Sequence, residues 1–250
     1  MRNAGKRIVA LTKRNLLEIV RDPLSLMFLI AMPLGMLVLF YFLFHRLTPQ
    51  FEMRYLAPGI IVFSQAFLSL FVGLLISMDR ASAFLTRLYV TPARSYEFVL
   101  GYTFAMIPVG LLQSALFFVV AGIIDPSFFS VNMLLGIVCS LLTALLFIGS
   151  GILLGSLCGE KSIGGVSSIV IAGQSVLSGM WFPLEGLGKG MIAMMNVLPF
   201  RPSAQFIQNI VLGSENRFDE IIKPFLTVLA YTVVIFAIAI FAYRQKMKER

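Results

Sequence analysis

Long apolar stretches alternate with short polar segments along most of the chain. Six of the stretches are about 20 to 27 residues long, and none has a charged residue in its interior. A helix needs roughly 20 apolar residues to cross ~30 Å of hydrocarbon, whereas the strands of a membrane barrel would alternate apolar and polar positions. The pattern therefore predicts an all-α membrane protein, a single transmembrane domain over residues 1–250 with six transmembrane helices. The predicted spans are residues 24–44, 56–78, 98–124, 133–157, 163–182 and 224–243.

The distribution of basic residues predicts the orientation of these spans. With six spans both termini lie on one side, and that side holds fourteen of the 20 Lys and Arg residues, while acidic residues divide evenly. Because positive charge is retained in the cytoplasm, both termini of this multi-pass membrane protein are predicted to be cytoplasmic. The net charge of +8 then lies against anionic membrane lipid, and it gives no reason to expect a nucleic-acid partner.

The first polar segment, residues 5–21, has the pattern of an amphipathic helix. Its apolar and charged residues fall on opposite arcs at 100° per residue, and Asp22-Pro23 would end the helix. This predicts an interfacial helix on the inner membrane surface, and a disordered basic tail is the alternative. The apolar arc consists of Ile8, Val9, Leu11, Leu16, Ile19 and Val20.

The longest internal cytoplasmic connection, residues 79–97, carries apolar residues that a simple connector would not need. Phe84, Leu85 and Leu88 share one face of a short helix with Arg87 beside them, and Thr91-Pro92 ends it. From composition alone this helix could dock onto a cytoplasmic protein or lie against lipid headgroups.

The longest external segment, residues 183–223, is interrupted by proline and loosened by glycine. Its apolar part, residues 191–198, is too short to span. Asn196 and Pro199 favour short helices that dip into the outer leaflet. Since irregular backbone at membrane depth needs protein or water to satisfy its polar groups, this segment is expected to lie against the bundle near an exit route.

Several activities are excluded by what the sequence lacks. The predicted spans contain no acidic, basic or His residue of the kind that binds a coupling proton or sodium ion, which leaves open only a sodium site built from carbonyl and hydroxyl oxygens. Residues 155–162 resemble a phosphate-binding loop only superficially, because Glu160 stands where that loop needs Gly. No set of catalytic side chains is recognisable, and two isolated cysteines do not suggest a metal site. The chain is therefore predicted not to be an enzyme and to bind no cofactor.

Three motifs resemble those of the membrane subunits of type-2 ATP-binding-cassette exporters. The resemblance covers nearly the whole chain, in the same order and with six spans, and the third motif is the most specific. The motifs are Tyr55-Leu56-Ala57-Pro58-Gly59; Leu85-x-x-Leu88-x-x-Thr91-Pro92 followed by Gly101; and Leu177-Ser178-Gly179-x-x-Phe182-Pro183-Leu184-Glu185 with Leu198-Pro199 beyond.

The resemblance implies a partner and a mechanism. In that family the amphipathic helix and the loop between spans two and three contact a separate cytoplasmic ATPase subunit, which binds ATP and Mg. Two membrane subunits, identical or related, complete the transporter. The resemblance also implies re-entrant helices before the sixth span. The coupling residues it implies are Phe84, Leu85, Arg87, Leu88, Thr91 and Pro92, and the re-entrant motif is Gly179, Phe182, Pro183, Leu184, Glu185 and Pro199.

Spans two and five commonly line the central cavity of such dimers, which implies a substrate path with uncharged polar groups in an apolar wall. That wall suits a drug-like or lipid-like substrate better than a bare ion. The alternative for these residues is hydrogen bonding between helices. The path residues are Ser64, Gln65, Ser69, Gln174, Ser175 and Ser178.

Two other classes of function remain open from the sequence. A membrane module that only captures a substrate, like that of a vitamin importer, would also have about six spans and no energy source. Such a module should, however, have a pocket whose polar side chains bind the captured substrate. A membrane assembly factor would need neither a docking helix nor a cavity.

Overall fold

A computed structural model describes residues 2–82, 94–181, 186–216 and 218–248. All regular secondary structure in these ranges is helical, in agreement with the predicted all-α class. In chain order the longer elements are α1 (Arg2–Val20), α2 (Pro23–Leu26), the π-helical η1 (Met27–Ala31), α3 (Met32–Phe44), α4 (Met53–Ala81), α6 (Ser95–Ile124), α7 (Val131–Leu157), α8 (Glu160–Leu177), α9 (Lys189–Val197), α10 (Phe200–Leu212), the π-helical η4 (Phe218–Ile222) and α11 (Lys223–Lys248).

Five segments of the described chain are long and apolar enough to cross a membrane. They coincide with the first four predicted spans and the sixth, and most extend a few residues beyond the predicted bounds. The helices are longer because their ends include polar residues, at which a hydropathy pattern stops. These segments are Pro23–Phe44, Met53–Ala81, Ser95–Ile124, Val131–Leu157 and Phe218–Gln245.

The fifth predicted span, residues 163–182, differs from the helix found there. α8 begins earlier, with the charged pair Glu160-Lys161, and ends at Leu177. Gly179, at φ +72°, follows in the left-handed region, where glycine is favoured because it has no Cβ. With its charged start and several Ser and Gly residues, α8 is not among the five segments above.

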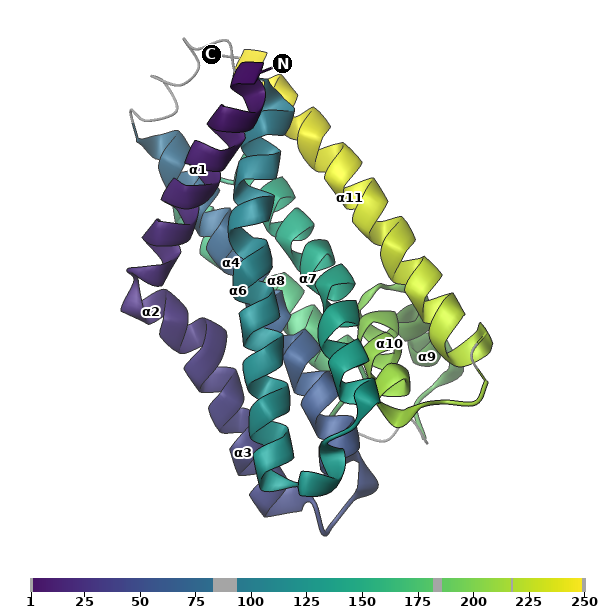
Figure 1. Cartoon of the computed structure of the whole chain (residues 1–250). Helices are drawn as coiled ribbons and strands as arrows, with labels where there is room; N and C mark the ends of the chain where they lie inside the picture. Colours follow the sequence, from purple (N-terminus) through teal and green to yellow (C-terminus); the bar gives the residue numbers. More distant parts are fainter. Residues whose placement is uncertain (1, 83–93, 182–185, 217, 249–250) are drawn as a thin grey trace.

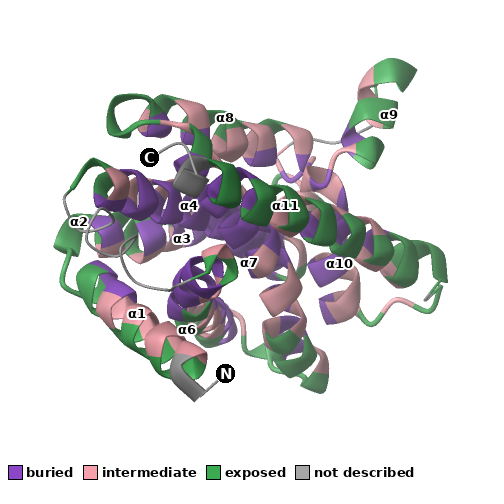
Figure 2. Cartoon of the chain, turned by 90° about the horizontal axis from the view of Figure 1, so that it is seen from above, coloured by how far each residue is buried: buried purple, intermediate pink, exposed green. Residues whose placement is uncertain are grey.

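Helix α4 forms the centre of the subunit. In the most apolar stretch of α4, 89% of the residues are buried. The corresponding values are 17% for the segment Pro23–Phe44 and 22% for the segment Phe218–Gln245. Seen from above, buried residues gather on α4 and the helices beside it, while α9 and α11 carry much exposed surface (Figure 2). Helix α4 also approaches α7 closely: a Cβ on Gly151 would lie 2.6 Å from the Ser69 carbonyl oxygen. The buried core is therefore centred on α4 and the helices packed against it.

Both termini lie at the same end of the molecule (Figure 1). There α1 leans across α6, which is its main neighbour. The chain then turns into α2, η1 and α3, which run towards the opposite end. This arrangement brings the N-terminal helix next to the end of α4 and the start of α6.

Candidate functional site

Helix α1 is joined to the start of α6 by a bidentate ion pair. Arg7 donates from Nε to Glu97 Oε2 at 2.6 Å and from Nη2 to Oε1 at 2.8 Å. The Glu97 side chain is 1% exposed. This geometry satisfies both carboxylate oxygens, and the hydrogen bond to Glu97 raises the pKa of Arg7 above its ordinary value. The pair fixes the N-terminal half of α1 on α6.

A second cluster joins α1 to the end of α4. Arg14 donates from Nη2 to Asp79 Oδ1 at 2.5 Å and from Nη1 to Oδ2. The Tyr102 hydroxyl on α6 donates to Asp79 Oδ2 at 2.7 Å. Arg14 also pairs with Glu18, one turn further along α1, at 2.7 Å. Asp79 is 3% exposed, so its negative charge depends on these partners for stabilisation.

The spacing of the two arginines explains why one helix makes both contacts. Arg7 and Arg14 are seven residues apart, which is close to two turns, so they share a face of α1. Asp79 and Glu97 stand on either side of residues 83–93. Helix α1 therefore holds both flanks of this stretch, which contains all the predicted coupling residues, Phe84, Leu85, Arg87, Leu88, Thr91 and Pro92, and lies outside the described residues.

The end of α4 is also attached to α7. Arg80 Nη1 donates to the carbonyl oxygens of Gly155 at 2.9 Å, Ser156 at 2.5 Å and Cys158 at 3.2 Å. The last carbonyls of a helix have no partner within the helix and carry partial negative charge, so a guanidinium suits them. Force applied near Arg80 would thus reach α7 directly.

The three predicted path residues on α4 are buried inside the subunit. Ser64 and Ser69 donate to the carbonyls of Ile61 and Ala66 in the same helix, each at 2.7 Å. Gln65 instead reaches two other helices. These residues have 0% exposure, so in this conformation they face protein and do not line an open cavity.

The amide of Gln65 is the centre of a hydrogen-bonded cluster. Its Nε2 donates to Ser114 Oγ on α6 and to the Ser140 carbonyl on α7, both at 3.1 Å. Its Oε1 accepts from Thr143 Oγ1 at 2.6 Å. The cluster joins α4, α6 and α7 in the interior of the bundle.

Replacement of Gln65 by Leu should lower the free energy of unfolding by about 1 kcal/mol, because three interhelical hydrogen bonds are lost while Ser and Thr keep backbone partners. Unfolding in detergent would measure the change. The same substitution at the exposed Gln245 is the matched control and should be neutral. An equal effect at both positions would contradict a structural role for this cluster.

The predicted path residues on α8 lie at its C-terminal end, and they differ among themselves. Ser175 Oγ accepts from Trp181 Nε1 at 3.0 Å, and Ser178 Oγ accepts from the Met180 backbone N–H at 3.3 Å. Gln174 is fully buried, and neither polar atom of its amide has a hydrogen-bond partner among the described residues. Of the six path residues, Gln174 is the one whose buried side-chain polar atoms have no hydrogen-bond partner in the part of the chain that the structure describes.

The re-entrant motif is described only in part. Gly179 lies in the turn after α8, and Pro199 separates α9 from α10. The other four residues, Phe182, Pro183, Leu184 and Glu185, lie outside the described residues. Trp181, just before them, packs edge-on against Phe40 of α3 at 4.9 Å and Phe63 of α4 at 5.9 Å between ring centroids.

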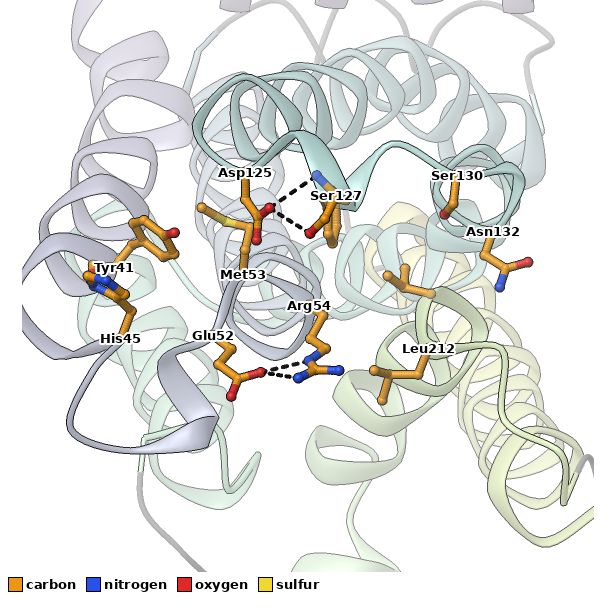
Figure 3. Close-up of a pocket in the computed structure, with 12 residues that line it drawn as sticks. Tyr41, His45, Glu52, Met53, Arg54, Asp125, Ser127, Ser130, Asn132 and Leu212 are labelled. Carbon is orange, nitrogen blue, oxygen red and sulfur yellow. Dashed lines mark hydrogen bonds and ion pairs between the residues drawn. The ribbon is translucent and has the colours of Figure 1, made fainter.

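A polar cavity of about 610 Å³ opens at the end of the molecule opposite the termini (Figure 3). The ends of α3, α4 and α10 and the α6–α7 turn surround it. Glu52 and Arg54 form an ion pair on one side, and Asp125 accepts from Ser127 N and Oγ on another. Sequence reasoning missed this cavity because its residues come from three stretches that lie far apart in the sequence.

Sequence reasoning also missed the contacts of Asp79 and Glu97, which it treated as loop residues. The sequence signal for these contacts was the seven-residue spacing of Arg7 and Arg14 on the predicted amphipathic helix.

Within the described residues, no group of three or more His, Cys, Asp or Glu side chains is placed to hold a metal ion.

The family model described as ABC-2 type transporter matches residues 6–212, from α1 to the end of α10. A comparison with curated proteins gave no match. The family match covers most of the chain and confirms the resemblance inferred from the three motifs. The chain therefore belongs to the ABC-2 type transporter family, as a membrane permease subunit with no catalytic ATPase site of its own.

Proposed function

We propose that this chain is the membrane subunit of an exporter that moves a hydrophobic or amphipathic substrate, drug-like or lipid-like, out of a bacterial cell. A separate cytoplasmic ATPase binds ATP and Mg and supplies the energy. A second permease, identical or related, completes the substrate path. Family membership supports the ATPase partner, because permeases of this family generally pair with one.

The observation that carries the proposal is the attachment of α1 to both flanks of residues 83–93. A segment that receives force from an ATPase must be fixed to the helices it is to move. Here α4 and α6 are tied to α1 through Asp79 and Glu97, and α4 is tied to α7 through Arg80. Closure of the ATPase pair would shift these helices together, and the membrane halves would alternate between inward-open and outward-open states.

The proposed topology has six crossings with both termini in the cytoplasm. Helix α8 is the fifth crossing, because it follows α7 at the end that carries the termini and packs along α4. The short helices α9 and α10, separated at Pro199, form the re-entrant segment before the sixth span. Arg201 Nη1, at the start of α10, donates to Asn196 Oδ1 of α9 at 2.8 Å and so joins the two short helices.

The proposed substrate path runs past α8 to the outer cavity. Gln174 supports this route, since its buried amide has hydrogen-bonding capacity that α4 and α10 do not use. The cavity lined by Arg54, Asp125 and other polar residues would let a polar headgroup leave toward water. Ser64, Gln65 and Ser69 would join the path only if α4 moved away from its present neighbours.

The test is the amount of ATPase that remains bound when the predicted coupling face is altered. We expect Leu85→Asp to lose most of the ATPase that copurifies with the wild-type chain, because a carboxylate would be buried in an apolar contact. Leu47→Asp, in the exposed connection between the first two spans, is the matched control. Full ATPase retention by Leu85→Asp would contradict docking through this face.

A further inference from the structure

Two adjacent cavities lie where α1 turns into the first span. One, of about 680 Å³, is lined by charged residues of α1 and by Asp22. The other, of about 520 Å³, lies between the first span and α4 and is apolar over most of its wall. Glu18 and Asp22 line both cavities, so the two share a boundary of carboxylates. We call the first, an open groove whose wall combines charged residues with apolar surface from Ala10 and Leu17, the chamber, and the second the slot.

The slot has the depth of one membrane leaflet. Its wall on α4 extends from Leu70 to Met78, and the eight helical steps between these residues span ~12 Å along the helix axis. One leaflet contributes about half of the ~30 Å of hydrocarbon in a bilayer. Leu24 and Phe28 form the opposite wall. A hydrocarbon chain parallel to α4 would therefore be covered by apolar side chains through most of a leaflet.

A π-helical turn shapes this opposite wall. In η1, Phe28 faces the slot, while the Leu29 carbonyl accepts a hydrogen bond from Gln113 Nε2 of α6 at 2.5 Å. Turns of this kind are rare and occur frequently at functional sites. The hydrogen bond holds the first span at a fixed position on α6, which keeps the slot open beside it.

The chamber offers charges of both signs. Lys13, Arg14 and Arg21 supply positive charge, and Glu18 and Asp22 supply negative charge. Hydrogen bonding to Ser25 lowers the pKa of Asp22, whereas burial raises that of Glu18. Arg14 and Glu18 are paired with each other, while Lys13, Arg21 and Asp22 form no ion pair within the described part of the chain. A phosphate alone would meet only the two basic residues, and an amine alone would leave them without a partner.

We propose that this site binds a phospholipid with an amine-bearing headgroup, of the phosphatidylethanolamine type. The phosphate lies near Lys13 and Arg21, the ammonium donates to Glu18 and Asp22, and one acyl chain occupies the slot between η1 and α4. The bound lipid thereby contacts Glu18, which is paired with the Arg14 that holds Asp79. The lipid would stabilise the position of α1 at the end of the molecule where Asp79 and Glu97 flank the predicted coupling residues. The site does not require the proposed export function. With both termini in the cytoplasm, as proposed, the leaflet that supplies the lipid is the inner one.

The experiment is native mass spectrometry of the purified full chain, delipidated and then offered phosphatidylethanolamine, phosphatidylglycerol or phosphatidylcholine in turn. We expect the first lipid adduct to be about tenfold more abundant with phosphatidylethanolamine than with either of the others, since only its headgroup combines a phosphate with an ammonium that donates hydrogen bonds. Leu74→Trp, which fills the slot, should remove this preference. Leu134→Trp, on the exposed face of α7, should keep it.

A second variant separates lipid binding from folding. Asp22→Asn retains the helix cap, because Asn caps as well as Asp, but it removes the charge that would meet the ammonium. It should remain folded and lose most of the preference for phosphatidylethanolamine. Equal binding of all three lipids by the wild type, or a preference that survives both Leu74→Trp and Asp22→Asn, would overturn the proposal. Preferential binding of phosphatidylglycerol would also overturn it, since basic residues alone would then account for the site.

Discussion

Replacement of Asp79 by Ala is expected to lower the free energy of unfolding by about 2–3 kcal/mol, because the buried Tyr102 hydroxyl loses its acceptor and Arg14 loses one carboxylate partner while it keeps Glu18. The loss should be visible as an earlier transition in thermal unfolding followed by size-exclusion chromatography. Since α1 would no longer hold the end of α4, ATP hydrolysis by the complex should also lose its dependence on substrate.

The matched control for Asp79 is an ion pair of the same kinds of residue at the opposite end. Glu52 pairs with Arg54, but their side chains are 37% and 60% exposed. Glu52→Ala should therefore cost less than 1 kcal/mol. If Asp79→Ala is as mild as Glu52→Ala, the cluster at the end of α4 does not hold α1 in place.

Gly151→Ala is expected to lower the free energy of unfolding by about 2–3 kcal/mol. The added methyl group would collide with backbone atoms of α4, which cannot rotate away as a flexible side chain can. The new Cβ would lie 2.6 Å from the carbonyl oxygen and 2.8 Å from the Cα of Ser69. Helices α4 and α7 would have to separate, with loss of the packing that surrounds the central helix. Denaturant unfolding in detergent measures the effect.

The control for this change is a glycine in open space. A Cβ on Gly35 of α3 would meet nothing within 4 Å, and Ala is preferred over Gly in a helix by roughly 1 kcal/mol. Gly35→Ala should be neutral or stabilising. Equal stability of the Gly151→Ala and Gly35→Ala variants would show that the close contact of α4 with α7 is not required.

Helix positions could be predicted from the sequence because hydropathy and length are local properties of the chain. The limits of the prediction are also physical. Hydropathy ends a span at its first charge, so Asp79 and Glu97 were treated as loop residues, although α1 supplies arginines that allow them to be buried within α4 and α6. For the same reason the charged start of α8 was left outside the fifth predicted span.

The environment of uncharged polar residues could not be predicted from the sequence. A serine in a helix can donate to its own backbone, as Ser64 does, and then tolerates an apolar surrounding. Gln65 and Gln174 look alike in the sequence, but one amide is fully bonded and the other has no partner among the described residues. Only the packing of neighbouring helices distinguishes them.

The coupling of this permease to a separate ATPase is tested most directly by purification of the intact chain from membranes of its own host. Mass spectrometry would then identify the proteins that accompany it in mild detergent. We expect a cytoplasmic ATPase of the ATP-binding-cassette class, in a one-to-one ratio with the permease. A well-folded chain that reproducibly lacks any ATPase would show that this permease does not couple to one.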